Sequence, residues 1–557
     1  MSHIPLTFLL FFFLFQSLSA QDPVYESGGE LIREQAAFNV KHYDLDLKVD
    51  PADSTVAGTG SMTAEIVHPA KEIVLDLDPR FQIDSVQEIS RAGAKNLTFR
   101  TTPGSKRIYI HFDRTRQPGE KITVRITYHG RPVVAANPPW DGGFVWETSP
   151  SGDPWIGVAC QTAGAWIWWP NKDHPSDKPD SVSLSFTLPD ELTGVSNGRF
   201  LGTSQAEEGW KTWHWFVSAP ISNYNVTLNA ARYETISDRY RRAGGEAMDI
   251  VFWVLPEYRE KAEKLFPQFE EQIRYLEDLL GPYPFRSDKY GVAHAPYLGM
   301  EHQTLIAYGA NFKNDNLFGS QSGFDDLHQH ELAHEWWGNL VTAWDWRDFW
   351  IHEGFATYMQ ALYAEHLGGS ESYRRMMAVF RQSITSRRQV APRESRTTAQ
   401  MNESGRGGDI YFKGAWFLHT LRYLVGDKIF FESLRRFAYP DDTPDSNRDG
   451  GQVRFVTTDD YLELVNRLSG EKLEWVFEVY LRRKAMPVLT KKRTADTLIL
   501  AWNAPGGAHF PMPVEIVVDG ERKVLEFEEG PVSVDVRAGA PVEIDPDRRI
   551  LMSVEEE

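Results

Sequence analysis

The hydrophobic period of this 557-residue chain changes twice, and that change limits its fold more than any other feature. From about residue 39 to 233, short runs such as HYDLDLKV and KITVRITYHG alternate apolar and polar residues, which is typical of half-buried antiparallel strands. Up to about residue 484, apolar residues recur every three or four positions, as in PEYREKAEKLFPQFEEQIRYLEDLLG, and predict amphipathic helices interrupted by a strand-like KYGVAHAPYL. Strand-like alternation then returns. We predict a multidomain α+β protein with an N-terminal antiparallel β domain, a mainly α domain and a small C-terminal β-sandwich.

The length of the chain supports this division. A chain of 557 residues exceeds what one hydrophobic core usually accommodates. We place the β domain at residues 21–235, the mainly α domain at 236–485 and the β-sandwich at 486–557.

Residues 1–20 have the features of a signal peptide. An apolar run extends from Leu6 to Leu18, and the small residue Ala20 precedes a plausible cleavage point. No Lys or Arg precedes the run, and Leu18 is larger than the residue usually found there, so an uncleaved membrane anchor is the alternative. No other segment is long and apolar enough to span a bilayer. We expect an exported protein, periplasmic or extracellular, whose mature chain has no membrane-spanning segment.

The net charge and the single cysteine argue against some functions. A formal net charge of -19 argues against a nucleic-acid partner, because the phosphates would be repelled. The single cysteine, Cys160, cannot form an intramolecular disulfide, and we expect a small buried thiol rather than a nucleophile. Residues 445–450 match the first half of a calcium-binding loop, but Val456 stands where such a loop needs a bidentate Glu. We therefore interpret this loop as an ordinary exposed turn.

The segment from His330 to His334, with the sequence HELAH, carries the strongest chemical signal. On a helix, residues four apart lie on the same face, so the two imidazoles can bind one metal ion. Imidazole nitrogens suit zinc, and Glu331 can reach a zinc-bound water as a general base. The same pattern also arises by chance in long chains, so a third ligand at a sensible spacing is the test.

Glu353 supplies that third ligand. Eighteen residues separate it from His334, enough for the chain to leave the first helix and return along a second. His330, His334 and Glu353 then form a site of two histidines and one carboxylate. His328 and His352 lie nearby but lack a partner four residues away, and we expect them to be supporting or surface histidines.

With these residues the chain resembles a known family. The interval before Glu353 in HEGFA and the sequence PYLGMEH about thirty residues before the zinc-binding segment are similar to those of the zinc aminopeptidases typified by aminopeptidase N. The resemblance covers most of residues 40–557. It implies a thermolysin-like catalytic domain at 236–485, one Zn²⁺ per chain and peptide substrates. It also implies a short form without the C-terminal helical domain of many relatives, for which we expect a more open cleft.

The resemblance assigns further roles. The exopeptidase motif of the family, Gly-x-Met-Glu-Asn, corresponds to Gly299, Met300 and Glu301, with Leu298 and His302 departing from the pattern. Glu301 would bind the free α-amine of the substrate, and the backbone of Gly299 and Met300 would pair with the peptide as an added strand.

Two further residues are implied by the same resemblance. Tyr411, which precedes Lys413-Gly414 in DIYFKG, would donate to the oxyanion that forms on the peptide carbonyl. Gln161 would contact the amino end of the substrate. The tryptophans after it could line the first subsite, but core filling is the preferred interpretation; they are Trp166, Trp168 and Trp169.

These features together predict a zinc-dependent aminopeptidase that hydrolyses the N-terminal bond of peptides with a free α-amine. Two alternatives stay open. One is a zinc endopeptidase or a hydrolase of another substrate, which the motif at Glu301 disfavours. The other is a non-catalytic binding protein on the same fold, which the retention of all three ligands and of Glu331 disfavours. Side-chain preference and oligomeric state cannot be read from the sequence.

Overall fold

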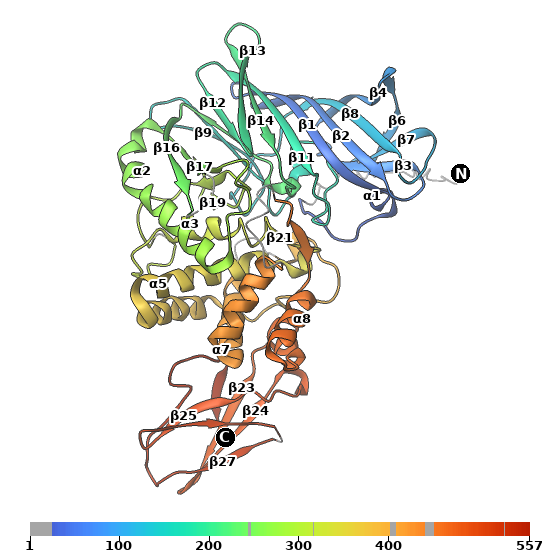
Figure 1. Cartoon of the computed structure of the whole chain (residues 1–557). Coiled ribbons are helices and arrows are strands. Elements are labelled where there is room, and N and C mark those ends of the chain that lie inside the picture. The colour runs from blue at the N-terminus through green and yellow to red at the C-terminus, as the bar shows by residue number, and fades with distance from the viewer. Residues whose placement is uncertain (1–24, 243–246, 316, 402–407, 441–449, 529) are drawn as a thin grey trace, which may run out of the picture.

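The structure is a computed structural model that describes residues 25–557 except 243–246, 316, 402–407, 441–449 and 529. The predicted signal peptide at 1–20 and nearly all of the loop at 445–450 lie outside the described residues. Figure 1 shows N-terminal sheets at the top, a helical region in the middle and C-terminal strands at the bottom. The predicted multidomain α+β architecture is confirmed.

An eight-stranded sheet forms most of the N-terminal region. Its strands in spatial order are β13 (Arg199–Gln205), β14 (Trp210–Val217), β11 (Ser181–Pro189), β1 (Phe38–Asp50), β2 (Thr55–Ile66), β8 (Lys121–Gly130), β4 (Gln82–Ser90) and β5 (Gly93–Asn96). The sheet is antiparallel except where β1 pairs with β11, which arrives after a long crossover and runs in the same direction.

Two smaller sheets and one short helix complete this region. They are β12 (Thr193–Ser196), β15 (Leu228–Ala231), β10 (Pro154–Ala159) and β9 (Gly143–Thr148) in the first, β3 (Ala70–Asp76), β7 (Arg107–Arg116) and β6 (Thr98–Thr101) in the second, and α1 (Arg33–Ala36).

The alternation of apolar and polar residues explains why these segments form strands. In β1, Tyr43, Leu45 and Leu47 are buried, whereas Asp44 and Asp46 between them are exposed, so one face of the strand packs on the core and the other meets solvent. The tryptophans at 166, 168 and 169 are fully buried in this core, as predicted. The thiol of Cys160 is also buried and donates to the carbonyl of Tyr224.

The middle region is helical, as predicted, and its helices follow the apolar spacing. In α3, Phe269, Ile273, Leu276 and Leu280 form a buried stripe. The helices are α2 (Arg259–Leu265), α3 (Pro267–Leu280), α4 (Asp326–Ala333), α5 (Trp350–Ser383), α6 (Thr398–Met401), α7 (Gly414–Ala438), α8 (Thr458–Ser469) and α9 (Glu474–Phe477).

This region also contains a five-stranded sheet, of which the sequence predicted only one strand. In spatial order it comprises β16 (Glu234–Arg241), β17 (Ala247–Val254), β18 (Tyr290–His294), β20 (Ile306–Tyr308) and β19 (Gly299–Met300). The predicted strand is β18. Strand β20 is buried on both faces and β19 has two residues, so neither shows alternation. A further two-stranded sheet pairs β21 (Val341–Ala343) with β22 (Arg454–Val456).

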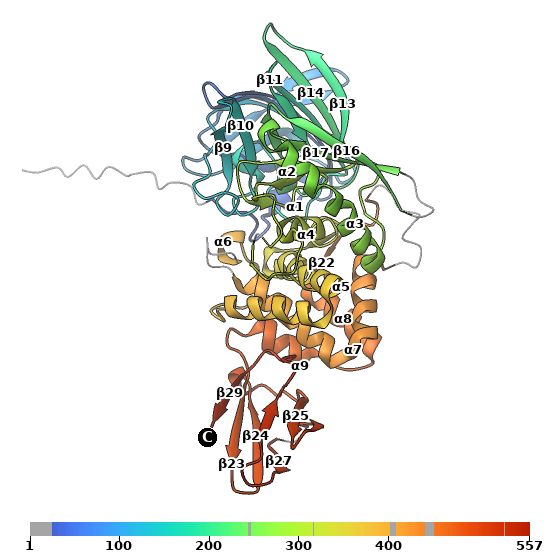
Figure 2. The same ribbon diagram turned by 90° about the vertical axis from the view of Figure 1, so that its left-hand side faces the viewer.

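The C-terminal region forms two small sheets. One contains β27 (Val532–Asp535), β24 (Thr497–Asn503), β23 (Val488–Arg493) and β29 (Ser553–Glu556), and the other β26 (Glu521–Leu525), β25 (Val514–Val518) and β28 (Val542–Ile544). The region lies beyond α7 and α9, at the end of the molecule opposite the N-terminal sheets (Figure 2). It is tied to α7 through His419, whose ring bonds to the carbonyl of Arg548.

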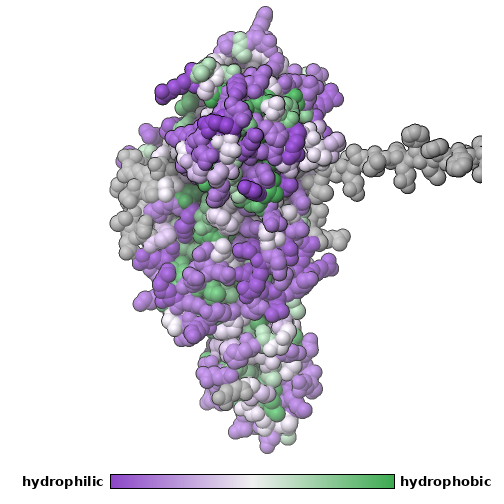
Figure 3. All heavy atoms as spheres, turned by 90° about the vertical axis from the view of Figure 1, so that its right-hand side faces the viewer, coloured by the Kyte–Doolittle hydropathy of each residue, from purple (hydrophilic) through white to green (hydrophobic). Residues whose placement is uncertain are grey.

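The surface of the molecule is largely polar. The face in Figure 3 is mostly hydrophilic, with apolar residues scattered across it. Among the described residues, no helix combines the length and apolarity needed to cross a membrane.

Candidate active site

Helix α4 carries the predicted ligand His330, and the second predicted ligand, His334, is the residue that caps its C-terminal end. The first turn of the helix is capped by Asp325, whose carboxylate accepts a hydrogen bond from the backbone N–H of His328 at 2.9 Å. His330 and His334 then lie one turn apart, and their Nε2 atoms approach within 3.1 Å. The helix therefore places both nitrogens at one point, as the four-residue spacing predicted.

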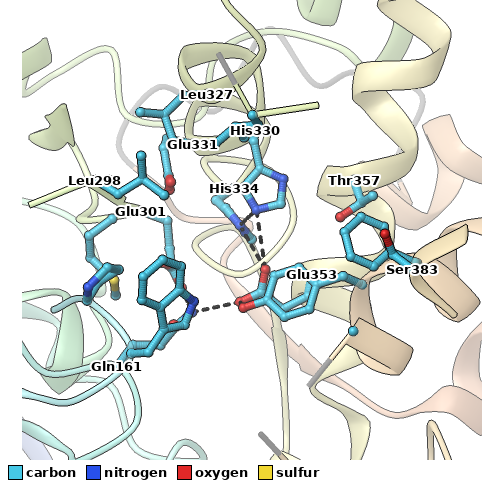
Figure 4. Close-up of a pocket in the computed structure, with 18 of the residues that line it drawn as sticks. Gln161, Leu298, Glu301, Leu327, His330, Glu331, His334, Glu353, Thr357 and Ser383 are labelled. Carbon is cyan, nitrogen blue, oxygen red and sulfur yellow. Dashed lines mark hydrogen bonds and ion pairs between the residues drawn. The ribbon is translucent and has the colours of Figure 1, made fainter. Parts of the chain in front are cut away.

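Glu353, near the start of α5, turns one carboxylate oxygen toward this point. Its Oε2 lies 3.4 Å from Nε2 of His330 and 3.4 Å from Nε2 of His334 (Figure 4). Zinc bonds of about 2.0–2.1 Å in a tetrahedron place the ligand atoms about 3.3 Å apart. The three atoms therefore have the spacing that one zinc ion requires.

A second group of side chains also converges here, formed by Glu301, Glu331 and His334. No ion pair joins His334 to either of these two carboxylates, whereas all three contacts of the first group are 3.4 Å or shorter. We therefore assign the metal to His330, His334 and Glu353.

The charge around His334 fits a bound cation. Burial opposes the protonation of this imidazole, but the carboxylates of Glu301, Glu353 and Glu331 outweigh burial and raise its pKa to about 10. The three buried carboxylates therefore stabilise a positive charge at Nε2 of His334. A metal ion bound to the neutral imidazole would supply this positive charge in place of the proton.

Hydrogen bonds orient the ligands. Nδ1 of His334 lies 2.9 Å from the carbonyl of Trp337, so this nitrogen carries the proton and Nε2 presents its lone pair. His352 is not a ligand, because its Nε2 accepts the backbone N–H of Ala343. His328 lies between Tyr290 and Gln272. Both of these histidines are fully buried, so they support the core and do not lie on the surface.

Glu331 packs against the backbone of β19. A Cβ atom added at Gly299 would lie 2.7 Å from Oε1 of Glu331 and 2.7 Å from Cδ1 of Leu327. Only glycine leaves room for this carboxylate beside the strand. Burial raises the pKa of Glu331 well above its ordinary value, so the group can hold a proton.

Gln161 joins Glu301 to the metal ligands. Its Nε2 donates to Oε1 of Glu301 at 2.7 Å and to Oε1 of Glu353 at 2.8 Å. Burial raises the pKa of Glu301 to about 7. The N-terminal region thus contributes a side chain that fixes a second carboxylate next to the metal site.

Tyr411 contacts the same carboxylate oxygen of Glu353 as Gln161 does. Its hydroxyl donates to Oε1 of Glu353 at 2.9 Å, and burial raises its pKa well above the usual value, so it stays a proton donor. The residue lies in a π-helical turn, Asp409–Lys413. This turn can approach α5 because a Cβ at Gly354 would lie only 3.0 Å from the carbonyl of Ile410.

All nine predicted site residues line or adjoin one cavity of about 640 Å³. Sequence reasoning missed the rest of its lining, since these side chains come from loops and helix ends without a motif. They include Pro139, Trp140, Leu317, Phe318, Thr357, Ser383, Thr385, Arg387 and Phe412. Among the described residues, the tryptophans at 166, 168 and 169 do not line it, and no residue beyond 412 does.

Two histidines on one helix, a carboxylate from the next and an adjacent buried Glu define a zinc metallopeptidase centre. Residues 39–225 match the peptidase M1 N-terminal domain, and residues 260–480 match the peptidase family M1 domain. The chain belongs to peptidase family M1.

Individual relatives agree with this assignment. Leukotriene A-4 hydrolase of Xenopus laevis is 25% identical over 346 residues, which are 60% of this chain and 53% of that protein. Aminopeptidase B of Mus musculus is 24% identical over 439 residues, 73% of this chain and 63% of its own. The chain thus spans between half and two thirds of the length of these curated relatives.

A solved structure aligns with a larger share of this chain than these relatives do. The crystal structure of a mutant M1 zinc metallopeptidase from Deinococcus radiodurans, bound to a Tyr-Ser-Ala substrate, is 25% identical. It aligns with 81% of this chain and 95% of its own, with a TM-score of 0.64.

Proposed function

We propose that this chain is a zinc-dependent aminopeptidase that hydrolyses the N-terminal peptide bond of peptides with a free α-amine. One observation carries the proposal: Gln161 bonds at once to Glu301 and to Glu353. A carboxylate that can pair with an ammonium group is therefore fixed one side chain away from a metal ligand. A peptide whose α-amine pairs with Glu301 presents its first peptide bond at the metal site.

Each residue of the site has its own role in the proposed hydrolysis. His330, His334 and Glu353 would hold the zinc ion, which when bound polarises a carbonyl and activates water. Glu331, with its raised pKa, accepts a proton in the cavity and returns it to the leaving amine. The hydroxyl of Tyr411 is positioned to donate to the developing oxyanion.

Strand β19 gives the substrate its direction. It forms the edge of the five-stranded sheet and pairs on one side with β20. Gly299 and Met300 both line the cavity, so an extended peptide can add to this edge through main-chain hydrogen bonds. Glu301 directly follows the strand and limits how far the peptide extends.

Known relatives support the same activity. One is named aminopeptidase B, and the Deinococcus radiodurans metallopeptidase was solved with a tripeptide substrate. Neither name specifies the side chain preferred by this chain.

Aminoacyl-naphthylamides and their N-acetylated counterparts test the proposal. We expect hydrolysis of the free-amine substrates alone, its loss with a zinc chelator and its recovery on adding zinc. Equal hydrolysis of acetylated substrates would indicate an endopeptidase. No hydrolysis by protein with stoichiometric zinc would favour a different substrate or a binding role.

We also propose that the protein is exported, on the evidence of the apolar run from Leu6 to Leu18 and of Ala20 after it. N-terminal sequencing of protein recovered from a cell fractionation tests this. A mature chain starting near Gln21 in the soluble exported fraction is expected. An intact N-terminus in the membrane fraction would indicate an uncleaved anchor instead.

A further inference from the structure

The turn after strand β19, residues 301–304, has a backbone shape that its surroundings impose. Thr304 has a φ of 61°, in the left-handed region that β-branched residues rarely adopt. Its backbone N–H donates to Oε1 of Glu335 at 2.8 Å, and its hydroxyl oxygen accepts the backbone N–H of Gly198 at 2.8 Å. Strained conformations of this kind persist only where neighbouring groups fix them. The turn that carries Glu301 is therefore held from outside.

Asn339, between α4 and β21, joins this turn to a metal ligand. Its side-chain amide donates to the backbone carbonyl of Glu301 at 3.2 Å. Its backbone N–H donates to the carbonyl of His334 at 3.0 Å. Asn339 is fully buried, so water does not compete for these hydrogen bonds. One residue thus connects the backbone at Glu301 to the backbone of a zinc ligand.

The N-terminal region holds Asn339 in place. The side-chain amide of Asn225 donates to the side-chain oxygen of Asn339. The ammonium group of Lys178 donates to the backbone carbonyl of Asn339 at 2.6 Å. Both donors are buried and belong to the N-terminal region, whereas Asn339 belongs to the helical region. The position of Asn339 therefore depends on the packing of the two regions.

Glu301 is consequently fixed at two points. Gln161 joins its carboxylate to that of Glu353. Asn339 joins its backbone to that of His334. A substrate whose ammonium group pairs with Glu301 must bring the scissile carbonyl to the metal site. An error of about 1 Å in such a placement costs about 10²-fold in rate. The distance from Glu301 to the metal site thus decides which substrates react.

We propose that Asn339 is a positioning residue, which sets the distance between the carboxylate of Glu301 and the metal site. This inference rests on the proposed aminopeptidase function. Asn339 acts through Glu301 and His334 and is not among the described residues that line the active-site cavity. The fixed distance makes the enzyme select an amine on the carbon next to the scissile carbonyl. An amine one carbon further away pairs with Glu301 only if the carbonyl leaves the metal site.

The test uses L-alanyl- and β-alanyl-naphthylamide, two isomers that differ only in the position of the amine. For the zinc-loaded wild type we expect kcat/KM to favour the α isomer by about 10²-fold or more. Asn339→Ala removes the side-chain bond to Glu301, and we expect the ratio to fall by about tenfold, mainly through slower hydrolysis of the α isomer. A general loss of stability lowers both rates alike. The ratio therefore distinguishes positioning from a structural role.

Two further variants assign the effect to Asn339. Asn225→Ala removes only the support from the N-terminal region and should lower the ratio by a smaller factor. Asn171→Ala is the matched control, because Asn171 is also fully buried and makes the same two kinds of bond. Its amide donates to the carbonyl of Trp169 at 2.8 Å, and its side-chain oxygen accepts from Asn223 at 3.4 Å. It is not among the described residues that line the active-site cavity and should keep the wild-type ratio.

The outcomes separate this inference from the proposed function. Equal hydrolysis of the two isomers by the wild type, or a ratio that Asn339→Ala leaves unchanged at full zinc content, would overturn the inference alone. An equal fall in Asn171→Ala would do the same, because the effect would then be general. If Asn339→Ala does not fold, Asn225→Ala decides, and an unchanged ratio in that variant contradicts the inference. Absence of hydrolysis of the α isomer by the zinc-loaded wild type would overturn the proposed function itself.

Discussion

At the scale of single residues, the site depends on which carboxylate holds a proton and which holds the metal ion. Glu331 is buried and its pKa is raised. Glu353, and not Glu331, makes the 3.4 Å contacts with the ligand nitrogens of His330 and His334. Glu331→Gln removes the proton acceptor but keeps the shape of the side chain. We expect kcat to fall by about 10²- to 10⁴-fold with the zinc content unchanged. Loss of zinc from this variant would show instead that Glu331 is a ligand.

Glu301 has a different task, and its substitution should change selectivity more than chemistry. Glu301→Gln keeps the hydrogen-bonding shape beside Gln161 but removes the charge that pairs with the α-amine. We expect KM for free-amine substrates to rise by about tenfold or more, since a charge-assisted contact is lost. The ratio of free-amine to acetylated substrate measures this effect. A ratio equal to that of the wild type would exclude amine recognition by Glu301.

At the scale of elements, strand β19 and helix α4 fit together only because residue 299 has no side chain. Gly299→Ala would place a methyl group 2.7 Å from the carboxylate of Glu331. We expect a large loss of kcat/KM, because Glu331 or the strand must shift. Gly60→Ala is the control: its Cβ would lie 2.8 Å from Pro170 in the N-terminal region, a similar clash away from the site. If both variants lose activity and melting temperature equally, the effect at Gly299 is only structural.

The elements also show what the sequence could predict. The two histidine ligands were predictable because residues four apart lie on the same face of a helix, whatever surrounds the helix. Strand β20 beside β19 was not, since its three residues are all buried and show no alternation. Arg387 carried no motif, and only the fold brings its loop beside Asp409.

At the scale of the whole molecule, the site is assembled from two regions, and the metal ion should stabilise their union. Gln161, just beyond β10, reaches Glu301 and Glu353 in the helical region. The resemblance pointed to this Gln, but its double contact depends on how the two regions pack, which spacing along the chain does not reveal.

Zinc removal tests this coupling. Without the cation, the carboxylates around His334 repel one another in a buried site, so we expect a chelator to lower the melting temperature and added zinc to restore it. Saturating zinc should contribute about 3–4 kcal/mol to the free energy of unfolding. Glu353→Gln should abolish the zinc-dependent shift, whereas Glu331→Gln should keep it. An identical melting temperature with chelator and with zinc would argue against a tightly bound metal ion.

The central claim is that a free α-amine directs hydrolysis to the first peptide bond. The most direct measurement is mass spectrometry of a ten-residue peptide and its N-acetylated form during incubation with the zinc-loaded protein. The account predicts a ladder of products shortened one residue at a time from the N-terminus, with the acetylated peptide left intact. Cleavage at internal bonds, or equal cleavage of the acetylated peptide, would contradict it.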